Sequence, residues 1–323
     1  MLVSVIIPVF NAEPYIDRCI HELSSQTYGD FEAIFVVDSK CTDNTMQKLQ
    51  NTTDTSFSIK IIEQHDDKRA GGARNIGIDN ATGDYIWFMD VDDCPCISFM
   101  EEMVKTITEN NEDVIVCNFC YSRTTDNYTI PDKNYKIKRF TGFEAITALN
   151  NGKLSANIWD KMYKTSFIKN NNIKFIAGCS EDYAFVLNTF LSTDKIVYYN
   201  KPLYVYYLHD DSTSKGQGDE IAKRDIEIFA EFAKKLKESD SPYYEEYCST
   251  TIRHILHSLT NVSKPVFKEL SNEEIIKESL KYRQKFSLEV FFFKLNKGLF
   301  YFIGRNARRL KYSRAKLFID NDI

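Results

Sequence analysis

The first 120 residues alternate short apolar runs with segments whose apolar side chains recur at helical spacing, and this alternation constrains the fold most. Val3–Val9 is a nearly continuous apolar run, which is typical of a strand buried on both faces. Further strands are predicted at residues 31–37, 59–62, 85–89 and 114–119, and helices at 14–25, 42–49 (capped by Thr42), 73–81 and 98–110. Alternating strands and helices predict an α/β fold with a mostly parallel, Rossmann-like sheet flanked by helices. In such sheets ligands bind at the carboxyl ends of the strands.

The rest of the chain is patterned differently. Residues 120–215 are mixed, with a helix predicted at 182–191 and two short strands at 196–199 and 203–208. The polar stretch 212–219 is typical of a boundary or a loop. From residue 220 the pattern is helical and is divided by Pro242 and Pro265. We therefore predict two domains, residues 1–215 and a helical region at residues 216–323.

Composition excludes several classes of protein. The chain has 323 residues, of which 43% are hydrophobic and 27% charged, as expected for a folded globular protein. It begins without the basic and apolar pattern of a secretory signal, and no uncharged apolar stretch reaches about 18 residues. We expect no transmembrane helix, a cytoplasmic location and free thiols at the eight cysteines. Cys117 and Cys120 have zinc-knuckle spacing, but a strand would send them to opposite faces, so structural zinc is not expected.

The C-terminal segment reverses the sign of the charge. Residues 281–316 contain 11 Lys or Arg residues and one acid, Glu289, whereas the whole chain has a net charge of −5. One apolar stripe runs through the segment at helical spacing and consists of Leu288, Phe292, Leu295, Leu299 and Phe302. A basic amphipathic helix is typical of segments that bind an anionic membrane surface. The stripe could equally pack on the body of the protein, and both interpretations stay open here.

Three acids follow the predicted strand at residues 85–89. In an extended backbone Asp90 and Asp92 would point the same way, and Asp93 follows directly. Oxygen ligands of this kind hold hard cations, so Mn²⁺ or Mg²⁺ bridging to a diphosphate is a candidate. An acidic, solvated turn is the alternative, because such triplets are common by chance.

Two further segments accompany the acids. Gly71 and Gly72 open a predicted helix and allow close backbone approach, and a helix N-terminus attracts anions. Arg74, in the same helix, could pair with a phosphate or with one of the acids. Asp38 ends the second predicted strand, where it could accept hydrogen bonds from a base or a ribose.

Six motifs in order resemble a known family. They are Ser-Val-Ile-Ile-Pro-Val-Phe-Asn at 4–11, Ser-Gln-Thr-Tyr at 25–28, Asp-Asn-Thr at 43–45, Ala-Arg-Asn-Ile-Gly at 73–77, Ala-Thr-Gly-Asp-Tyr-Ile at 81–86 and Phe-Met-Asp-Val-Asp-Asp at 88–93. Together they resemble the family 2 glycosyltransferases of bacterial surface-polysaccharide type, which have the GT-A fold. The resemblance covers about residues 1–215.

The resemblance implies roles for individual residues. It places Asp182, in the pair Glu181-Asp182, as the catalytic base, and Asp90 and Asp92 at the metal-bound diphosphate. It places Ser39 where the family often has a second acid, which leaves nucleotide recognition open. On the donor side it implies Pro8, Phe10, Asn11, Asp38, Ser39, Arg74, Asp90 and Val91. On the acceptor side it implies Trp159, Lys161 and Glu181, and His209 is a further candidate for metal or phosphate. A buried core Trp at 159, a surface His at 209 and helix-start acids at 181 and 182 are the alternatives.

The resemblance also implies a reaction. We expect an inverting transfer of a sugar from a nucleotide donor, most simply a UDP-sugar, to a glycan or a lipid-linked glycan. Two alternatives stay open: a sugar-phosphate nucleotidylyltransferase, and a catalytically altered homologue that serves as a scaffold. The first normally has a Gly-rich loop after its first strand, where this chain has Pro8-Val9-Phe10-Asn11. Nucleic acid is not an expected partner, because the excess of positive charge is confined to one tail and no known nucleic-acid-reading motif accompanies it.

Overall fold

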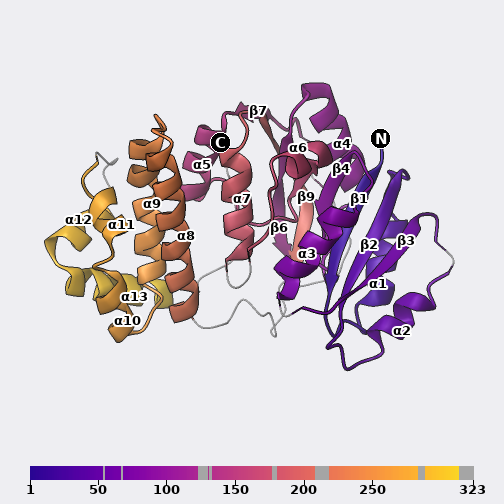
Figure 1. The fold of residues 1–323 in the computed structure, drawn as a ribbon, viewed down its shortest axis with the longest axis horizontal. Helices are drawn as coiled ribbons and strands as arrows, with labels where there is room; N and C mark the ends of the chain where they lie inside the picture. The colour runs from indigo at the N-terminus through magenta and orange to yellow at the C-terminus, as the bar shows by residue number, and fades with distance from the viewer. Residues whose placement is uncertain are drawn as a thin grey trace. The chain divides into compact units, whose positions relative to one another are not determined.

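The chain divides into two compact units. A computed structural model describes residues 1–53, 55–66, 68–122, 130, 133–176, 180–207, 218–282 and 288–312. One unit comprises Met1–Gly142 and Ala156–Asp211, and the other comprises Phe143–Ser155 and Ser212–Ile323. Figure 1 traces their helices and strands. The boundary expected between residues 215 and 216 lies outside the described residues and stays a prediction.

The first unit is built on one mixed sheet, which has nine strands in the described part of the chain. The strand order is β3-β2-β1-β4-β8-β6-β9-β5, with β7 beside β9. β3, β2, β1 and β4 are parallel, as are β6 and β9, whereas β8, β5 and β7 run antiparallel to their neighbours. The bounds are β1 Val3–Val9, β2 Phe31–Asp38, β3 Ser58–Gln64, β4 Tyr85–Phe88, β5 Cys94–Pro95, β6 Val114–Ser122, β7 Ile137–Phe140, β8 Lys161–Lys164 and β9 Ile196–Tyr207.

Helices cover both faces of the sheet, as the buried strands predicted. The helices of this unit are α1 Ile16–Ser24, α2 Thr45–Gln50, α3 Arg69–Asn80, α4 Phe99–Asn110, α6 Thr165–Asn170 and α7 Glu181–Leu191. On one face, side chains of β1, β2 and β4 pack with α1 and α4 in a continuous core. On the other face, a Cβ on Gly77 of α3 would lie 2.2 Å from Ile6 Cγ2. Phe88 also meets Phe185 of α7 there, with ring centroids 5.5 Å apart. The predicted α/β fold is confirmed.

Three local predictions were wrong. Thr42 does not cap α2, because the N-cap position is Asn44 and the Thr42 amide instead donates to Asn11. α3 begins at Arg69, four residues before the predicted start. The two short strands expected at residues 196–208 are one strand, β9, whose register against β6 shifts on either side of Asn118. This irregularity accommodates the polar residues that had suggested a break.

The described part of the second unit is helical, as expected. Its helices are α5 Gly142–Asn150 (whose first residue belongs to the first unit), α8 Gly218–Glu238, α9 Tyr244–Leu259, α10 Lys264–Leu270, α11 Glu274–Ser279, α12 Leu288–Leu295 and α13 Lys297–Tyr312. Pro242 lies between α8 and α9, and Pro265 lies in the first turn of α10, where a missing N–H costs nothing. α5, which the sequence analysis did not predict, is tied to α9 by hydrogen bonds from Asn150 to Thr250 and Thr251.

The sequence also raised the questions of membrane-spanning helices and of cysteine pairing. None of the helices in the described ranges is long and apolar enough to cross a membrane. The seven cysteines in the described ranges are free, and Cys117 is buried in β6.

Candidate active site

Three parallel strands bring the predicted donor-side residues to one edge of the sheet. Val9 of β1 pairs with Val37 of β2, and Ile6 of β1 pairs with Phe88 of β4. The residues that follow these strands therefore emerge side by side, since neighbouring strands lie about 4.8 Å apart. Pro8 lies within β1 and Asp38 is the last residue of β2, and the predicted residues that follow the strands are Phe10, Asn11, Ser39, Asp90 and Val91.

The loops after β1 and β2 are joined by hydrogen bonds. Asn11 adopts a left-handed conformation (φ 46°), and its Oδ1 accepts a 2.8 Å hydrogen bond from the Thr42 amide. Asp38 Oδ1 accepts from the Lys40 amide at 2.9 Å, which closes a turn around Ser39. Phe10 stands out of these loops with 58% of its surface exposed. The structure thus fixes the loop backbones and leaves a large apolar side chain in solvent at this edge.

The acids after β4 lie in a turn. β4 ends at Phe88, and the Asp93 amide donates to the Asp90 carbonyl at 3.2 Å. The expectation that Asp90 and Asp92 share one side of an extended strand was therefore wrong. Asp93 is 3% exposed and accepts a 2.8 Å hydrogen bond from the Tyr204 hydroxyl. This buried hydrogen bond anchors the turn to β9. Arg18 of α1, which the sequence analysis did not single out, donates to the Asp92 carbonyl.

Arg74 of α3 joins the two acidic groups of the site. Its Nη2 lies 3.0 Å from Asp90 Oδ1, and its Nη1 lies 3.0 Å from Asp182 Oδ1 and 3.6 Å from Glu181 Oε1. Arg74 is 4% exposed, and its guanidinium also lies over the Phe175 ring, 5.5 Å from the centroid. Burial lowers the pKa of Arg74, but the three carboxylates outweigh this effect, and the pKa is raised. One buried cation therefore holds Asp90 and Asp182 in the same site.

Asp182 has a perturbed acidity. Burial raises the pKa of Asp182 to about 6, because the charged form is poorly solvated there; Arg74 opposes the rise, while Glu181 and Asp90 add to it. Its side chain nevertheless keeps 36% of its surface exposed. Glu181 and Asp182 occupy the first turn of α7, where the helix dipole also favours acids. A carboxylate of this kind is ionised near neutral pH, is more basic than an ordinary Asp, and is accessible.

Local packing explains why α3 and α7 meet at this point. Asn75 makes two 2.8 Å hydrogen bonds to the backbone of Phe175, donating to its carbonyl and accepting from its amide. A Cβ on Gly71 would lie 3.3 Å from Glu181 Cγ. The close approach that this glycine permits is thus to the protein itself, whereas the sequence had suggested a ligand. Phe175 stacks on Phe185 of α7 at 4.0 Å, so the clamp at Asn75 also fixes α7.

Comparison with known proteins decides the family. A family model described as glycosyl transferase family 2 matches residues 4–177, more than half of the chain. The chain belongs to glycosyltransferase family 2. It is 28% identical over 232 residues to glycosyltransferase GlyA of Streptococcus pneumoniae and 31% identical over 218 residues to YibD of Escherichia coli, a glycosyltransferase of uncharacterized function. These matches cover 66% of the chain in each case, but 31% of GlyA and 63% of YibD.

Solved structures share the fold of this family 2 chain. Residues 1–349 of Staphylococcus aureus TarS, in complex with UDP, align with a TM-score of 0.66 at 17% identity, covering 99% of this chain and 95% of that one. Mannosyltransferase PcManGT of Pyrobaculum calidifontis, in complex with GDP-Man and Mn²⁺, aligns with a TM-score of 0.55 at 14% identity, covering 95% and 86%. The nine-stranded sheet of the described residues thus belongs to a GT-A fold.

The carboxylates of Asp90 and Asp92 are suited to a divalent ion that is also coordinated by a phosphate of a bound substrate. Within the described ranges, no three His, Cys, Asp or Glu side chains gather as a metal site of their own. Asp90 and Asp92 are partly exposed, and Mg²⁺-type sites commonly combine one or two carboxylates with substrate phosphates. Burial raises the pKa of the Tyr204 hydroxyl, and the negative charges of Asp93, Asp90 and Asp92 raise it further. His209, the further candidate, lies outside the described residues.

Two of the three predicted acceptor-side residues, Trp159 and Lys161, are buried. Lys161 has no exposed surface, and its ammonium lies 2.7 Å from Asp160 Oδ1. Lys161 still reaches the site electrostatically, because it lowers the pKa of Asp182. Trp159 is 4% exposed and stacks on Tyr204 at 4.4 Å, which favours the interpretation of a core tryptophan. Of the acceptor-side set, Glu181 lies beside Asp182 with 22% of its side chain exposed.

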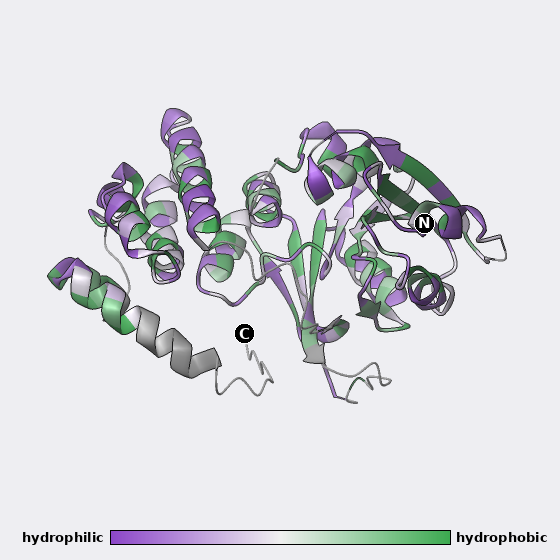
Figure 2. Ribbon diagram, turned by 90° about the horizontal axis from the view of Figure 1, so that it is seen from below, coloured by the Kyte–Doolittle hydropathy of each residue, from purple (hydrophilic) through white to green (hydrophobic). Residues whose placement is uncertain are grey.

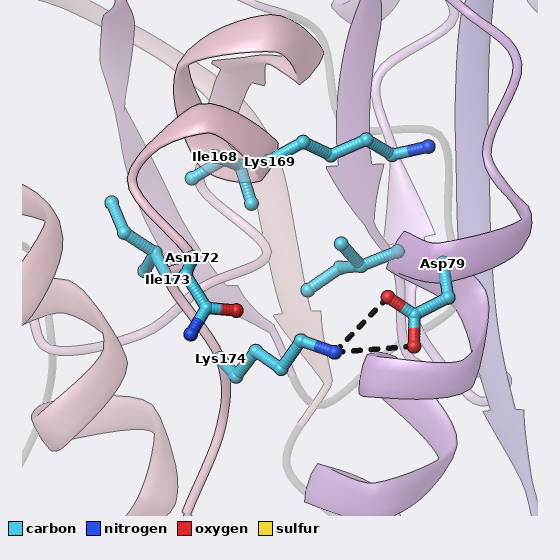
Figure 3. Close-up of a pocket in the computed structure, with 7 residues that line it drawn as sticks. Asp79, Ile168, Lys169, Asn172, Ile173 and Lys174 are labelled. Carbon is cyan, nitrogen blue, oxygen red and sulfur yellow. Dashed lines mark hydrogen bonds and ion pairs between the residues drawn. The ribbon is translucent and has the colours of Figure 1, made fainter.

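A pocket elsewhere in the first unit does not belong to this site. It has a volume of about 240 Å³ and lies between the C-terminal end of α3 and the α6 region (Figure 3). Lys174 Nζ lies 3.1 and 3.2 Å from the two oxygens of Asp79 across it. Arg74 lies in the middle of α3 and does not line this pocket, and the Lys169 ammonium there donates to the Ala81 carbonyl at 2.8 Å.

Proposed function

We propose that the chain transfers a sugar, with inversion, from a nucleotide-sugar donor to a hydroxyl of a glycan or lipid-linked glycan. The proposal rests on one observation above all: Arg74 holds Asp90 and Asp182 in one site, 3.0 Å from each. A UDP-sugar is the donor proposed, in line with TarS, which has been solved in complex with UDP and with UDP-GlcNAc. The acceptor class follows the surface-polysaccharide resemblance of the sequence motifs.

Asp182 would act as the base. The acceptor hydroxyl gives its proton to a carboxylate oxygen of Asp182 while the hydroxyl oxygen forms a bond to the anomeric carbon. The bond between that carbon and the diphosphate oxygen breaks, and its electron pair leaves with the nucleoside diphosphate. Deprotonation by a positioned base contributes about 10²–10⁴-fold. The raised pKa of Asp182, about 6, supports this role, because the group is ionised near pH 7 yet more basic than an ordinary Asp.

Asp90 and Asp92 would hold Mn²⁺ or Mg²⁺ together with the donor diphosphate. When bound, such an ion neutralises the negative charge that develops on the leaving diphosphate. Arg74 would support this arrangement, because its ion pair orients the Asp90 carboxylate. The Asp90 side chain remains 33% exposed and therefore accessible to a metal ion. Phe10, Asn11, Asp38 and Ser39 are proposed for the nucleoside, because their loops border the same edge of the sheet.

A donor-turnover screen tests the proposal. UDP-, GDP- and dTDP-sugars are incubated with the chain, with and without Mn²⁺, and the release of nucleoside diphosphate is measured. We expect metal-dependent release from UDP-sugars. Calorimetry with UDP and Mn²⁺ separates the alternatives, because no binding would favour a scaffold and a preference for nucleoside triphosphates would favour a nucleotidylyltransferase.

A further inference from the structure

The two C-terminal helices of the second unit have one packed face. Val290, Phe293 and Phe300 are 6%, 2% and 4% exposed. The Tyr301 hydroxyl donates to the Val262 carbonyl at 2.8 Å. A Cβ on Gly304 would lie 2.4 Å from Thr260 Cγ2, so α13 fits closely against the end of α9. These contacts hold α12 and α13 on the unit and fix which side of each helix remains outside.

The same two helices, whose ribbon is coloured by hydropathy in Figure 2, also expose large apolar residues to solvent. We call these residues the apolar face: Phe291, Leu295, Leu299, Phe302 and Ile303, which are 52%, 65%, 42%, 66% and 40% exposed. Three of them, Leu295, Leu299 and Phe302, belong to the stripe predicted from sequence and are not buried within the second unit. Half of the ten large hydrophobic residues found exposed in the described ranges lie on this face. Such clustering marks an interaction surface.

Charge selects the occupant of the apolar face. The segment at residues 281–316 carries a charge of +10, with 11 basic residues against Glu289, in a chain whose net charge is −5. In a symmetric dimer formed through this segment, a second copy would bring the same positive charge to the contact, and the like charges would repel. An anionic bilayer offers both an apolar interior for the exposed side chains and negative headgroups for the lysines and arginines.

We propose that the apolar face, which lies within the basic stretch of sequence at residues 281–316, docks the chain on an anionic phospholipid surface. This inference does not depend on the proposed transferase function, since it rests on residues of the second unit alone. Each Lys or Arg near such a surface strengthens binding, and the apolar residues add contacts that salt does not screen.

Vesicle sedimentation with the full chain tests this proposal. The probes are vesicles of phosphatidylcholine alone and of phosphatidylcholine with phosphatidylglycerol in equal parts. We expect the chain to sediment with the anionic vesicles only. The triple variant Leu295→Gln, Leu299→Gln and Phe302→Gln should bind them at least about tenfold more weakly. The matched control is Ile97→Gln with Ile137→Gln, which changes two exposed residues of the first unit (59% and 48%) and should bind as the unchanged chain does.

Three results would overturn the proposal. These are equal sedimentation of the triple variant, equal binding to both kinds of vesicle, and failure of the unchanged chain to bind. Analytical ultracentrifugation without vesicles adds a separate test. If the unchanged chain forms an oligomer and the triple variant is a monomer, the apolar face binds a second copy of the chain. Circular dichroism and a thermal melt establish that the variants are folded.

Discussion

Arg74 Nη1 and Asp182 Oδ1 lie 3.0 Å apart, although 108 positions separate the two residues in the chain. The same guanidinium contacts Asp90 through its other terminal nitrogen. The proposed base and the proposed donor-side acid therefore share one buried cation. Replacing either acid should therefore change the electrostatic environment of the other, because both acids are ion-paired with the same guanidinium.

Replacing Arg74 with Met should alter both the rate and its pH dependence. Because Arg74 lowers the pKa of Asp182, its loss should move the acidic limb of the pH–rate profile upward by about one unit. Turnover near neutral pH should also fall about 10²-fold or more, as when a preorganised charge is removed. Arg139→Met is the matched control, since Arg139 is exposed and pairs with Glu112. An unshifted profile for Arg74→Met would count against the coupling.

The unchanged chain should lose activity as the pH falls through about 6. The sign follows from the proposed role: Asp182 must be ionised to accept a proton, and its pKa is raised to about 6, so acid converts it to the inactive form. Near pH 7 the ionised form should exceed the protonated form about tenfold. The measurement is donor turnover across the range at saturating donor. A plateau extending well below pH 5 would assign the base to another group.

Asp90→Asn should weaken the response to metal. We expect chelation with EDTA to abolish turnover of the unchanged chain and added Mn²⁺ to restore it, and Asp90→Asn to require about tenfold more Mn²⁺. Asp93→Asn is the informative control, because Asp93 is buried against Tyr204 and should affect stability more than metal response. Equal metal titrations for the Asp90→Asn variant and the unchanged chain would contradict the assignment.

Breaking the buried pair beneath the site should destabilise the fold. Lys161→Met leaves Asp160, which is 1% exposed, without its ammonium partner, and the expected loss is about 3–5 kcal/mol in the free energy of unfolding. The double variant Lys161→Met with Asp160→Leu should recover much of that loss, since no lone charge remains buried. Urea denaturation measures both variants. A small effect of Lys161→Met would show that the pair is not structurally required.

The extent of sequence prediction differed between the fold and the site. The bounds of β1 were predicted to the residue, because a strand buried on both faces needs an almost unbroken apolar run. β5, β7 and β8 were missed; β7 is as short as β4 but is exposed at three of its four residues, whereas β4 is buried at all four and forms an apolar run. β9 was divided at Asn200 because a polar break cannot be distinguished from a shift in register by sequence alone.

Pairings within the site were the least predictable part. The sequence indicated that Arg74 could meet an acid, but only the fold shows that it meets Asp90 and Asp182 together. The acceptor-side role of Lys161 stays a prediction, and the sequence did not indicate that Lys161 is buried against Asp160. The exposed stripe on α12 and α13 had the right spacing, yet which helix face packs was decided by Phe293 and Phe300.

The most direct test of the central claim compares the unchanged chain with Asp182→Asn in donor turnover, with UDP binding measured in parallel by calorimetry in Mn²⁺. The account predicts that turnover falls about 10²–10⁴-fold while UDP binding stays within about threefold. Glu181→Gln, which changes the neighbouring carboxylate, should have a much smaller effect. Full turnover by a folded Asp182→Asn variant would contradict the account.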